Sequence, residues 1–417
     1  MLHRDGRCPA RRPAHRATEG HLMPTTACPY CYHRFQPANL RFQCTGRAAP
    51  GRTRCTRSVD EERLRLTGYA EASWPTFPPP PSRLRLPRRR ATCPDCGTDT
   101  GIRACPVCRT PLPANFADSR SPLIGMVGGK NSGKTVYTTV LVHELRHRVR
   151  RRFDADVSFA GEQAGARTAA WLEHYEHALF DDNELFESTA GSTDGSRVPL
   201  VVQWRQPHRS LGREVHSTTT LSFYDAAGED MTTQEFVNRQ AYLGAADGLI
   251  VLLDPFQLPG TRDRIAVPEA GMRETEPPLS VLGRLTELLR ATGGVGVRRR
   301  IPVPVAVVFS KIDAFYGMLG EGHPLLRAPS AGAHYDEAAG RDTDEHLRAL
   351  LADLGADDID AHLRAHYKSY RYFAVSSLGA EPDYDHKRID PGGVRPFRVD
   401  EPLLWLLGLF RIVERSG

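Results

Sequence analysis

The fold of this chain is decided by residues 123–135, LIGMVGGKNSGKT. The apolar run at 123–127 predicts a buried strand. The glycines after it match Gly-x-x-x-x-Gly-Lys-Thr, the pattern of a phosphate-binding loop that opens into a helix. In such a loop the backbone N–H groups surround a phosphate, and the positive end of the helix points at it. The stretch therefore predicts a nucleotide-binding α/β domain.

Individual residues of this loop have distinct expected roles. The loop is expected to hold the phosphates through Gly128, Asn131, Ser132 and Gly133. Lys134 is expected to reach the β- and γ-phosphates, and Thr135 to bind Mg²⁺. The chain has 50 arginines and five lysines, so a lysine at 134 or 311 marks a position where a compact ammonium differs from a planar guanidinium.

The rest of the chain alternates between apolar runs and helical patterns. Strands are predicted at residues 123–127, 199–205, 215–224, 247–253, 303–309 and 371–375. Helices are predicted at residues 134–151, 166–180, 232–243, 278–291, 343–354 and 400–414. This alternation predicts an α/β fold with a mostly parallel sheet and helices on both faces. The pair 199–205 and 215–224 predicts an antiparallel hairpin at one edge.

A first downstream motif, Asp225-Ala226-Ala227-Gly228, ends the predicted strand at 215–224. Its aspartate is expected to bind Mg²⁺ through water. The N–H of Gly228 is expected to contact the γ-phosphate and to sense its loss. The motif is short and common by chance, so its weight comes from its place at the end of a strand.

Two later motifs favour guanine. Ser310-Lys311-Ile312-Asp313 follows the strand at 303–309, and an aspartate there can accept both the N1–H and N2–H₂ donors of guanine, a pair that adenine lacks. The stem of Lys311 is expected to lie over the base. Ser376-Ser377 follows the strand at 371–375, where a backbone N–H can reach the guanine O6. Because ligands of open α/β sheets bind outside the carboxyl ends of the strands, the four motifs are expected to form one site.

These four motifs, in this order, resemble the Ras-like (TRAFAC) class of P-loop GTPases over about residues 122–414. With the cysteine pairs near the N-terminus, the chain also resembles a bacterial family of zinc-ribbon-bearing GTPases called double-GTPase proteins. The resemblance implies a guanine-nucleotide switch in a multi-protein system, in signalling or conflict defence. It implies phosphate and Mg²⁺ binding by Gly128, Lys134 and Thr135, a metal-sensing switch at Asp225 and Gly228, and a base pocket of Ser310, Lys311, Asp313 and Ser377.

Three departures from that family pattern bear on activity. Ser310 stands where most relatives carry asparagine, so an amide contact to the guanine is lost and a lower affinity is expected. Glu229 stands where Ras-like enzymes place a water-orienting glutamine. We expect Glu229 to act with Lys134 in catalysis, but its charge beside the phosphates favours slow attack. Thr189 and Thr193 are the candidates for a second Mg²⁺ hydroxyl.

All nine cysteines precede residue 110. Eight of them are predicted to form two consecutive zinc sites: Cys28, Cys31, Cys44 and Cys55 in the first, and Cys93, Cys96, Cys105 and Cys108 in the second. The C-x-x-C spacing lets two sulfurs face one tetrahedral metal. In a reducing compartment these cysteines favour metal over disulfides, and metal binding would supply the folding energy of modules this small. Cys8 is left over.

The predicted organisation has five parts. They are a basic leader at 1–22, disordered or untranslated if Met23 is the start, a first zinc-binding module at 23–60, a Pro/Arg-rich linker at 61–92, a second zinc ribbon at 93–113 and the GTPase domain at 120–417. No apolar run approaches the length needed to cross a bilayer, and no apolar segment follows the basic leader as in a secretory signal. We therefore expect a cytoplasmic protein without a membrane partner.

Charge is unevenly placed along the chain. Residues 1–120 carry a net charge of +12 and the remainder −7. A solvated basic linker is the favoured interpretation, and a surface for nucleic acid or an acidic protein is the alternative. A helical run, His143-Glu144-Leu145-Arg146-His147, matches the zinc-protease motif. Because that helix follows the phosphate loop and must pack on the sheet, a structural role is favoured.

The main hypothesis is a GTP-binding switch that hydrolyses GTP slowly and docks a protein partner through its zinc modules or its loop insertions at 255–277 and 314–342. GTP or GDP, Mg²⁺ and Zn²⁺ are the expected ligands. A non-hydrolysing, nucleotide-gated scaffold is one alternative. A nucleic-acid-binding ATPase is the other, and the residue that separates it from the main hypothesis is Asp313.

Overall fold

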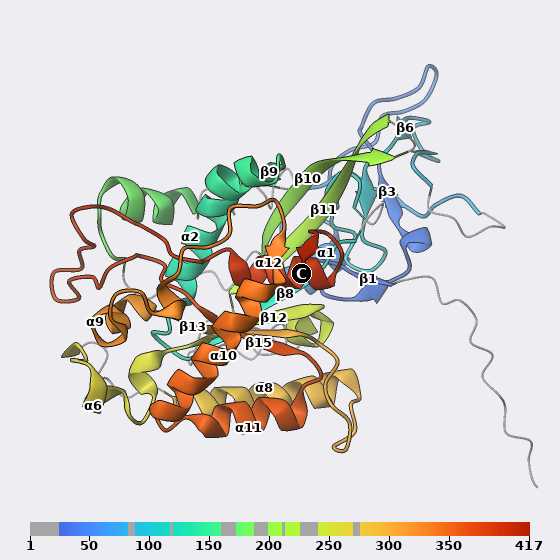
Figure 1. The fold of residues 1–417 in the computed structure, drawn as a ribbon. Coiled ribbons are helices and arrows are strands. Elements are labelled where there is room, and N and C mark those ends of the chain that lie inside the picture. The colour runs from blue at the N-terminus through green and yellow to red at the C-terminus, as the bar shows by residue number, and fades with distance from the viewer. Residues whose placement is uncertain are drawn as a thin grey trace, which may run out of the picture.

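The structure is a computed structural model that describes residues 25–81, 88–116, 120–159, 172–186, 199–210, 213–225, 241–269 and 276–417. Of residues 208–210, 213–215 and 224–225 it describes the backbone only. Within the described residues, the largest sheet has seven strands in the order β15-β13-β12-β8-β11-β10-β9 (Figure 1). They are β8 (Leu123–Gly128), β9 (Asp156–Phe159), β10 (Leu200–Ser210), β11 (Arg213–Asp225), β12 (Gly248–Leu253), β13 (Val305–Phe309) and β15 (Tyr370–Ala374). The strands from β15 to β11 run parallel, and β10 is antiparallel to both of its neighbours.

Helices cover both faces of this sheet. On one face lie α8 (Pro278–Gly293), α10 (Glu337–Asp353) and α11 (Asp357–His366), and on the other α2 (Lys134–Glu144) and α12 (Glu401–Leu409). Successive residues of β8 point to opposite faces, so Leu123 and Val127 join one apolar core while Ile124 and Met126 join the other. A strand buried on both faces has the near-continuous apolar sequence seen here, and the predicted fold class is confirmed.

Shorter elements complete this part of the chain. Helix α2 continues through the π-helical turn η2 (Leu145–Val149) into α3 (Arg150–Arg152). The others are η3 (His177–Asp181), η4 (Pro255–Gln257), η5 (Ile312–Phe315), η6 (Pro324–Leu326), α6 (Thr261–Arg264), α9 (Tyr316–Leu319) and the paired strands β14 (Tyr335–Asp336) and β16 (Arg415–Ser416).

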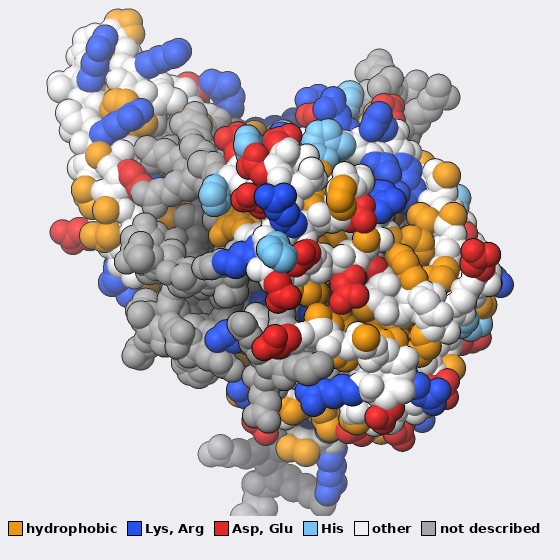
Figure 2. Space-filling model, turned by 90° about the vertical axis from the view of Figure 1, so that its left-hand side faces the viewer, with side chains coloured by type: hydrophobic (Ala, Val, Ile, Leu, Met, Phe, Trp, Pro, Cys, Tyr) orange, Lys and Arg blue, Asp and Glu red, His pale blue; other side chains and the backbone are white. Residues whose placement is uncertain are grey.

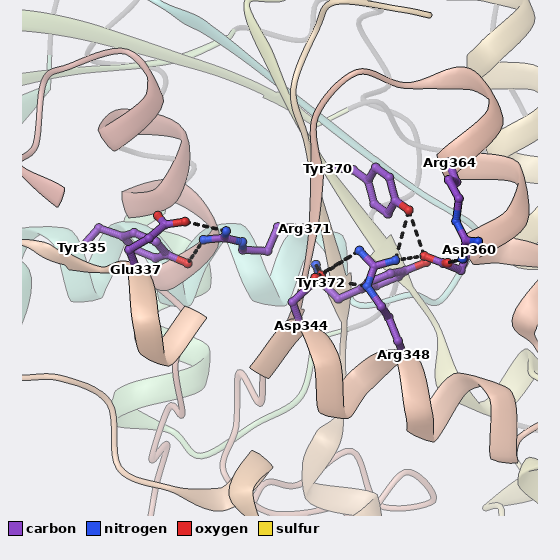
Figure 3. A network of polar contacts seen from close by, with 9 residues as sticks. All are labelled: Tyr335, Glu337, Asp344, Arg348, Asp360, Arg364, Tyr370, Arg371 and Tyr372. Carbon is purple, nitrogen blue, oxygen red and sulfur yellow. Dashed lines mark hydrogen bonds and ion pairs between the residues drawn. The ribbon is translucent and has the colours of Figure 1, made fainter. Parts of the chain in front are cut away.

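A polar network joins α10 and α11 to β15 (Figure 3). Arg348 of α10 pairs with Asp344 at 3.1 Å and with Asp360 of α11, and it donates to the Tyr370 hydroxyl at 3.1 Å. Its guanidinium also lies 4.9 Å from the centre of the Tyr370 ring. Asp344 in turn accepts from the backbone N–H of Tyr372 at 2.8 Å. One arginine therefore connects two helices and the edge strand.

The predicted strands of the sheet are confirmed, and two helix boundaries differ. The helix predicted at 343–354 begins earlier, at Glu337, because Asp336 caps it and accepts from Ala339 N at 3.0 Å. The helix predicted at 400–414 ends at Leu409. The hairpin of β10 and β11 is confirmed and extends from the Leu200–Phe223 pair to the Ser210–Arg213 pair.

Several elements, α11 and β9 among them, were not predicted, and two predicted helices fall partly outside the described residues. Helix α11 and strand β9 have few apolar residues, and α11 buries mainly Ile359 and Leu363. Residues 172–181, which include η3, and residues 241–245 are helical, in line with the helices predicted at 166–180 and 232–243, and residues 166–171 and 232–240 lie outside the described residues.

Residues 25–81 and 88–116 form the front module. It contains β1 (Thr26–Ala27), β2 (Arg34–Phe35), η1 (Pro37–Asn39), β3 (Arg41–Gln43), α1 (Glu61–Thr67), β4 (Thr76–Phe77), β5 (Ala91–Thr92), β6 (Asp99–Thr100) and β7 (Arg103–Ala104). Strand β3 pairs antiparallel with both β4 and β7. Strands from the first predicted zinc module, the predicted linker and the second module thus share one sheet. The prediction of two separate modules joined by an extended linker was wrong, and the leader at 1–22 lies outside the described residues.

The front module lies against the β10–β11 hairpin (Figure 1). Val201 of β10 packs into the apolar cluster of the module, and the side-chain amide of Gln203 donates to the Ala114 carbonyl at 2.7 Å. Within the module, α1 is capped by Asp60, which accepts from Arg63 N at 3.1 Å, and it ends at Gly68 in a left-handed conformation. This helix lies where the sequence predicted the first residues of a Pro/Arg-rich linker.

Candidate nucleotide-binding site and metal centres

The phosphate loop joins the end of β8 to the start of α2. Asn131 and Gly133 have φ angles of 62° and 86°, so the backbone turns through the left-handed region twice. A Cβ on Gly128 would lie 2.5 Å from the Ser132 Oγ, so only glycine fits there. The Ser132 hydroxyl donates to the Gly129 carbonyl at 2.9 Å, and the Lys134 Nζ donates to the carbonyls of Gly128 at 3.0 Å and Gly129 at 2.8 Å. The loop is therefore folded around its lysine.

This loop lies at the point where the chain order of the sheet reverses. Strand β8 is followed along the chain by β9, β10 and β11 on one side, and the chain then returns to β12 on the other. Ligands bind at such points in open α/β sheets. Asp225 ends β11, and its backbone is paired with Met126 of β8, two residues before Gly128. Thr135 is half-buried in the first turn of α2.

Several predicted switch residues cannot be placed. The side chain of Asp225 and the residues Gly228, Glu229, Thr189 and Thr193 lie outside what the structure describes. The roles predicted for them stay predictions.

The loop after β13 is hydrogen-bonded to the phosphate loop. The Ser310 hydroxyl reaches the Leu253 carbonyl at 2.8 Å and the Ser132 carbonyl at 3.3 Å. Lys311 has a φ of 54°, and its Nζ donates to the Asn131 carbonyl at 3.0 Å. The structure thus brings together two motifs that lie about 180 residues apart in the sequence.

Asp313 lies beside the strand end that carries Ser376. Burial raises the pKa of the Asp313 carboxyl, while a hydrogen bond from Ser376 and the charge of Lys311 oppose the rise. Ser376 is fully buried, and its Oγ accepts from Gly379 N at 2.7 Å. Ser377 is half-buried next to it. The carboxyl that is expected to contact guanine therefore lies next to a buried hydroxyl that can orient it.

Asp254 and Phe256 complete this arrangement and were missed in the sequence. The Asp254 carboxylate pairs with the Lys311 Nζ at 3.1 Å, and that ammonium lies 4.7 Å from the centre of the Phe256 ring. Asp254 is buried and follows β12 directly. The rule that placed the other motifs could have found it, since it too follows the carboxyl end of a parallel strand.

The eight described cysteines form two compact groups. One contains Cys28, Cys31, Cys105 and Cys108, and the other contains Cys44, Cys55, Cys93 and Cys96. In each group the sulfur atoms lie within 4.8 Å of one another. The predicted grouping was therefore wrong, because the outermost two pairs share one site and the inner two the other. Spacing identified the pairs, but which pairs meet is set by the pairing of β3 with β7.

The chemistry of these groups fits Zn²⁺. Four sulfurs at this separation match a tetrahedral Cys₄ site. The N–H groups of Tyr30 and Val107 donate to the sulfurs of Cys28 and Cys105 at 3.4 and 3.3 Å, which favours thiolates. Burial raises the pKa of the Cys28 thiol well above its ordinary value, so a cation is needed to keep that sulfur ionised.

The zinc-protease motif on α2 does not form a metal site in the structure. His143 contacts Glu176 at 3.2 Å, and Glu144 pairs with Arg148. The rings of His143 and His147 stack at 4.1 Å. Among the described residues, the two sets of cysteines are the only clusters of three or more His, Cys, Asp or Glu side chains close enough together to hold a metal ion.

Comparison with known families decides the identity of this domain. The family model named Double-GTPase 2 matches residues 122–370. The chain belongs to the Double-GTPase 2 family. The match covers the sheet strands from β8 to β13, the phosphate loop and the loop after β13, and the predicted resemblance is confirmed.

Individual proteins that resemble this Double-GTPase 2 protein share a quarter or less of their residues with it. The chain is 25% identical to a protein of Mycolicibacterium smegmatis provisionally named ESX-1 scaffolding and assembly protein SaeC, over 93% of this chain and 99% of that one. A solved nucleolar GTP-binding protein 1 of Plasmodium falciparum, also provisionally named, is 11% identical, with 72% of this chain and 90% of that chain covered and a TM-score of 0.27. The SRb-GTP/SRX complex of the Chaetomium thermophilum signal recognition particle receptor is 11% identical, with 63% and 94% covered and a TM-score of 0.26. In the part of the chain that the structure describes, no helix combines the length and the apolar character that a bilayer crossing requires.

Proposed function

We propose that this protein is a guanine-nucleotide switch that hydrolyses GTP slowly and engages protein partners through its front module. One observation carries the proposal. The loop with Ser310, Lys311 and Asp313 is hydrogen-bonded to the phosphate loop, so a purine beside Asp313 and phosphates beside Lys134 would occupy one continuous site. Membership of the Double-GTPase 2 family supports it.

The expected chemistry is an in-line attack of water on the γ-phosphorus. The bond from that atom to the β–γ bridging oxygen breaks, and GDP and phosphate leave. Lys134 and the loop amides would stabilise charge on the phosphate oxygens, and Glu229 would orient the water. Thr135 and Asp225 would hold a Mg²⁺ ion, which neutralises phosphate charge.

The eight cysteines are proposed to hold two Zn²⁺ ions that fix the front module for partner docking. The name of the mycobacterial relative, which refers to scaffolding and assembly, supports a protein partner. In Figure 2, acidic and basic side chains alternate over the centre of the drawn face, while the lobe at the upper left carries mostly basic ones. The mixed charge over the centre favours a protein partner there, because a nucleic-acid-binding surface is typically a continuous basic one.

The direct test is a titration of GTP, GDP and ATP against the wild-type protein and Asp313→Ala. Guanine nucleotides are expected to bind the wild type much more tightly than ATP, and Asp313→Ala is expected to lose that preference. Equal affinity of the wild type for ATP and GTP would instead favour the ATPase.

A second measurement separates the switch from a non-hydrolysing scaffold, which the name of the relative also favours. Phosphate release is followed from GTP at protein concentrations above its dissociation constant, in a single turnover. Slow release that Lys134→Ala abolishes is expected. A nucleotide-bound protein that releases no phosphate would support the scaffold.

A further inference from the structure

The knuckle formed by Cys28–Cys31 lies beside a segment of the GTPase domain that contacts the phosphate-loop strand β8. Tyr32, directly after the second cysteine of the pair, packs edge-to-face on Tyr242 with ring centres 5.2 Å apart. The Tyr242 hydroxyl donates to the Ile124 carbonyl in β8, the strand that ends in the phosphate loop. Both tyrosines are buried in the same core as Leu123. A metal-binding knuckle is thus packed against a residue that contacts the phosphate-loop strand.

Arg34 adds a polar contact to the same place. Its Nη2 donates to the Ala245 carbonyl at 2.8 Å and pairs with the Asp247 carboxylate at 2.7 Å. The other oxygen of Asp247 accepts from Leu123 N, at the start of β8, at 3.0 Å. Arg34 therefore joins the knuckle to the end of the helical turn at 241–245 and, through Asp247, to β8.

The contacted segment lies between a predicted phosphate sensor and a central strand of the sheet. Residues 241–247 follow the motif Asp225–Gly228, which is expected to sense the γ-phosphate, and they lead directly into β12. A segment that connects a phosphate sensor to a central strand is where nucleotide-dependent shifts would be transmitted. The Tyr32 ring and the Arg34 guanidinium, which follow the Cys28–Cys31 knuckle, both contact that segment.

We propose that the site formed by Cys28, Cys31, Cys105 and Cys108 is energetically coupled to the nucleotide site through Tyr32 and Arg34. A knuckle ordered by metal holds residues 242–247 in one position, and the nucleotide state that suits this position binds more tightly. By linkage, the nucleotide then changes the metal affinity of this cysteine site by the same factor. The inference rests on the proposed nucleotide-binding function and adds a regulator to it.

The experiment compares the ratio of affinities for GDP and a non-hydrolysable GTP analogue in full-length variants. Arg34→Ala removes the polar contact, and Arg34→Lys is the rescue variant, since one ammonium can replace the single Nη2 that makes both contacts. Arg90→Ala is the matched control, because it also removes an arginine–aspartate pair. That pair, Arg90 with Asp99, is exposed, and both of its residues belong to the front module. Zinc per chain is measured in every variant, and two ions are expected in each.

The affinity ratio is expected to change by about fivefold in Arg34→Ala, a typical allosteric coupling, and to stay at the wild-type value in Arg34→Lys and Arg90→Ala. In the wild type, the rate at which a chelator removes zinc is expected to differ between the GDP-bound and analogue-bound protein, and Arg34→Ala should reduce that difference. Tyr32→Leu, which removes the edge-to-face ring contact with Tyr242 but leaves an apolar side chain there, is a second variant, and its affinity ratio is expected to change in the same direction as in Arg34→Ala.

An unchanged ratio in both Arg34→Ala and Tyr32→Leu, with two zinc ions retained, would overturn the coupling while leaving guanine-nucleotide binding intact. A wild type that binds neither nucleotide would instead overturn the proposed function. The two failures are therefore distinguishable.

Discussion

At the scale of single residues, Ser310 shows how the loop after β13 is held in place. Its hydroxyl bonds to the carbonyls of Leu253 and Ser132, so it joins the base loop to β12 and to the phosphate loop. Its position after a strand was predictable from the sequence. Its partners were not, because they lie 57 and 178 residues away and meet only through the sheet. Asp254, which pairs with Lys311, was missed because no motif marked it.

Replacing Ser310 with alanine is expected to weaken GTP and GDP equally. The change removes a buried hydroxyl whose hydrogen bonds contribute roughly 1 kcal/mol, so both dissociation constants should rise about fivefold to tenfold. The preference for guanine over adenine should remain, since Asp313 is untouched. Ser280→Ala, at an exposed position in the first turn of α8, is the matched control. Isothermal titration calorimetry checks the result, and a loss of purine preference in Ser310→Ala would contradict it.

At the scale of elements, apolar periodicity predicted the strands and the helices that pack on them. A strand buried on both faces needs a continuous apolar run, and β8, β12 and β13 each show one. Helix α11 was not predicted because its packing depends on two apolar residues and on a polar contact, the pairing of Asp360 with Arg348. Such a contact carries no periodic signal in the sequence.

The Arg348 network predicts a stability effect at this scale. Arg348→Ala would leave Asp344 and Asp360 without their shared cation, and the Arg348 side chain is 30% exposed. Because water screens part of that interaction, we expect a loss of about 1–2 kcal/mol in the free energy of unfolding. Arg327→Ala, which removes a surface pair with Asp342 of the same helix, is expected to cost less than about 0.5 kcal/mol. Denaturant unfolding measures the free energy of unfolding of both variants. Equal losses in Arg348→Ala and Arg327→Ala would contradict the stabilising role of the Arg348 network.

At the scale of the whole molecule, the chain forms a front module that lies against a GTPase domain. The sequence predicted the cysteine pairs but grouped them by their proximity in the chain. The fold groups them by strand pairing, since β3 and β7 bring the first and last pairs together. Tertiary contacts of this kind cannot be read from ligand spacing, which is the same for either grouping.

Double cysteine variants test the nested grouping. Cys28→Ser with Cys105→Ser damages one site only, so one zinc per chain is expected to remain. Cys93→Ser with Cys105→Ser damages both sites, and little zinc is expected to remain. Grouping by proximity in the chain predicts the reverse order, because Cys28 and Cys105 would then belong to different sites. Metal analysis of the purified variants distinguishes the two arrangements.

The most direct test of the central claim, that Asp313 reads a guanine base held beside the phosphate loop, is the nucleotide specificity of Asp313→Asn. Xanthine presents an oxygen where guanine presents the N2 amino group, and an asparagine amide can donate to that oxygen while still accepting from N1–H. We predict that Asp313→Asn loses affinity for GTP and gains affinity for XTP. Asp313→Ala is expected to lose affinity for GTP without gaining affinity for XTP. An Asp313→Asn protein that still prefers GTP over XTP to the wild-type extent would contradict the account.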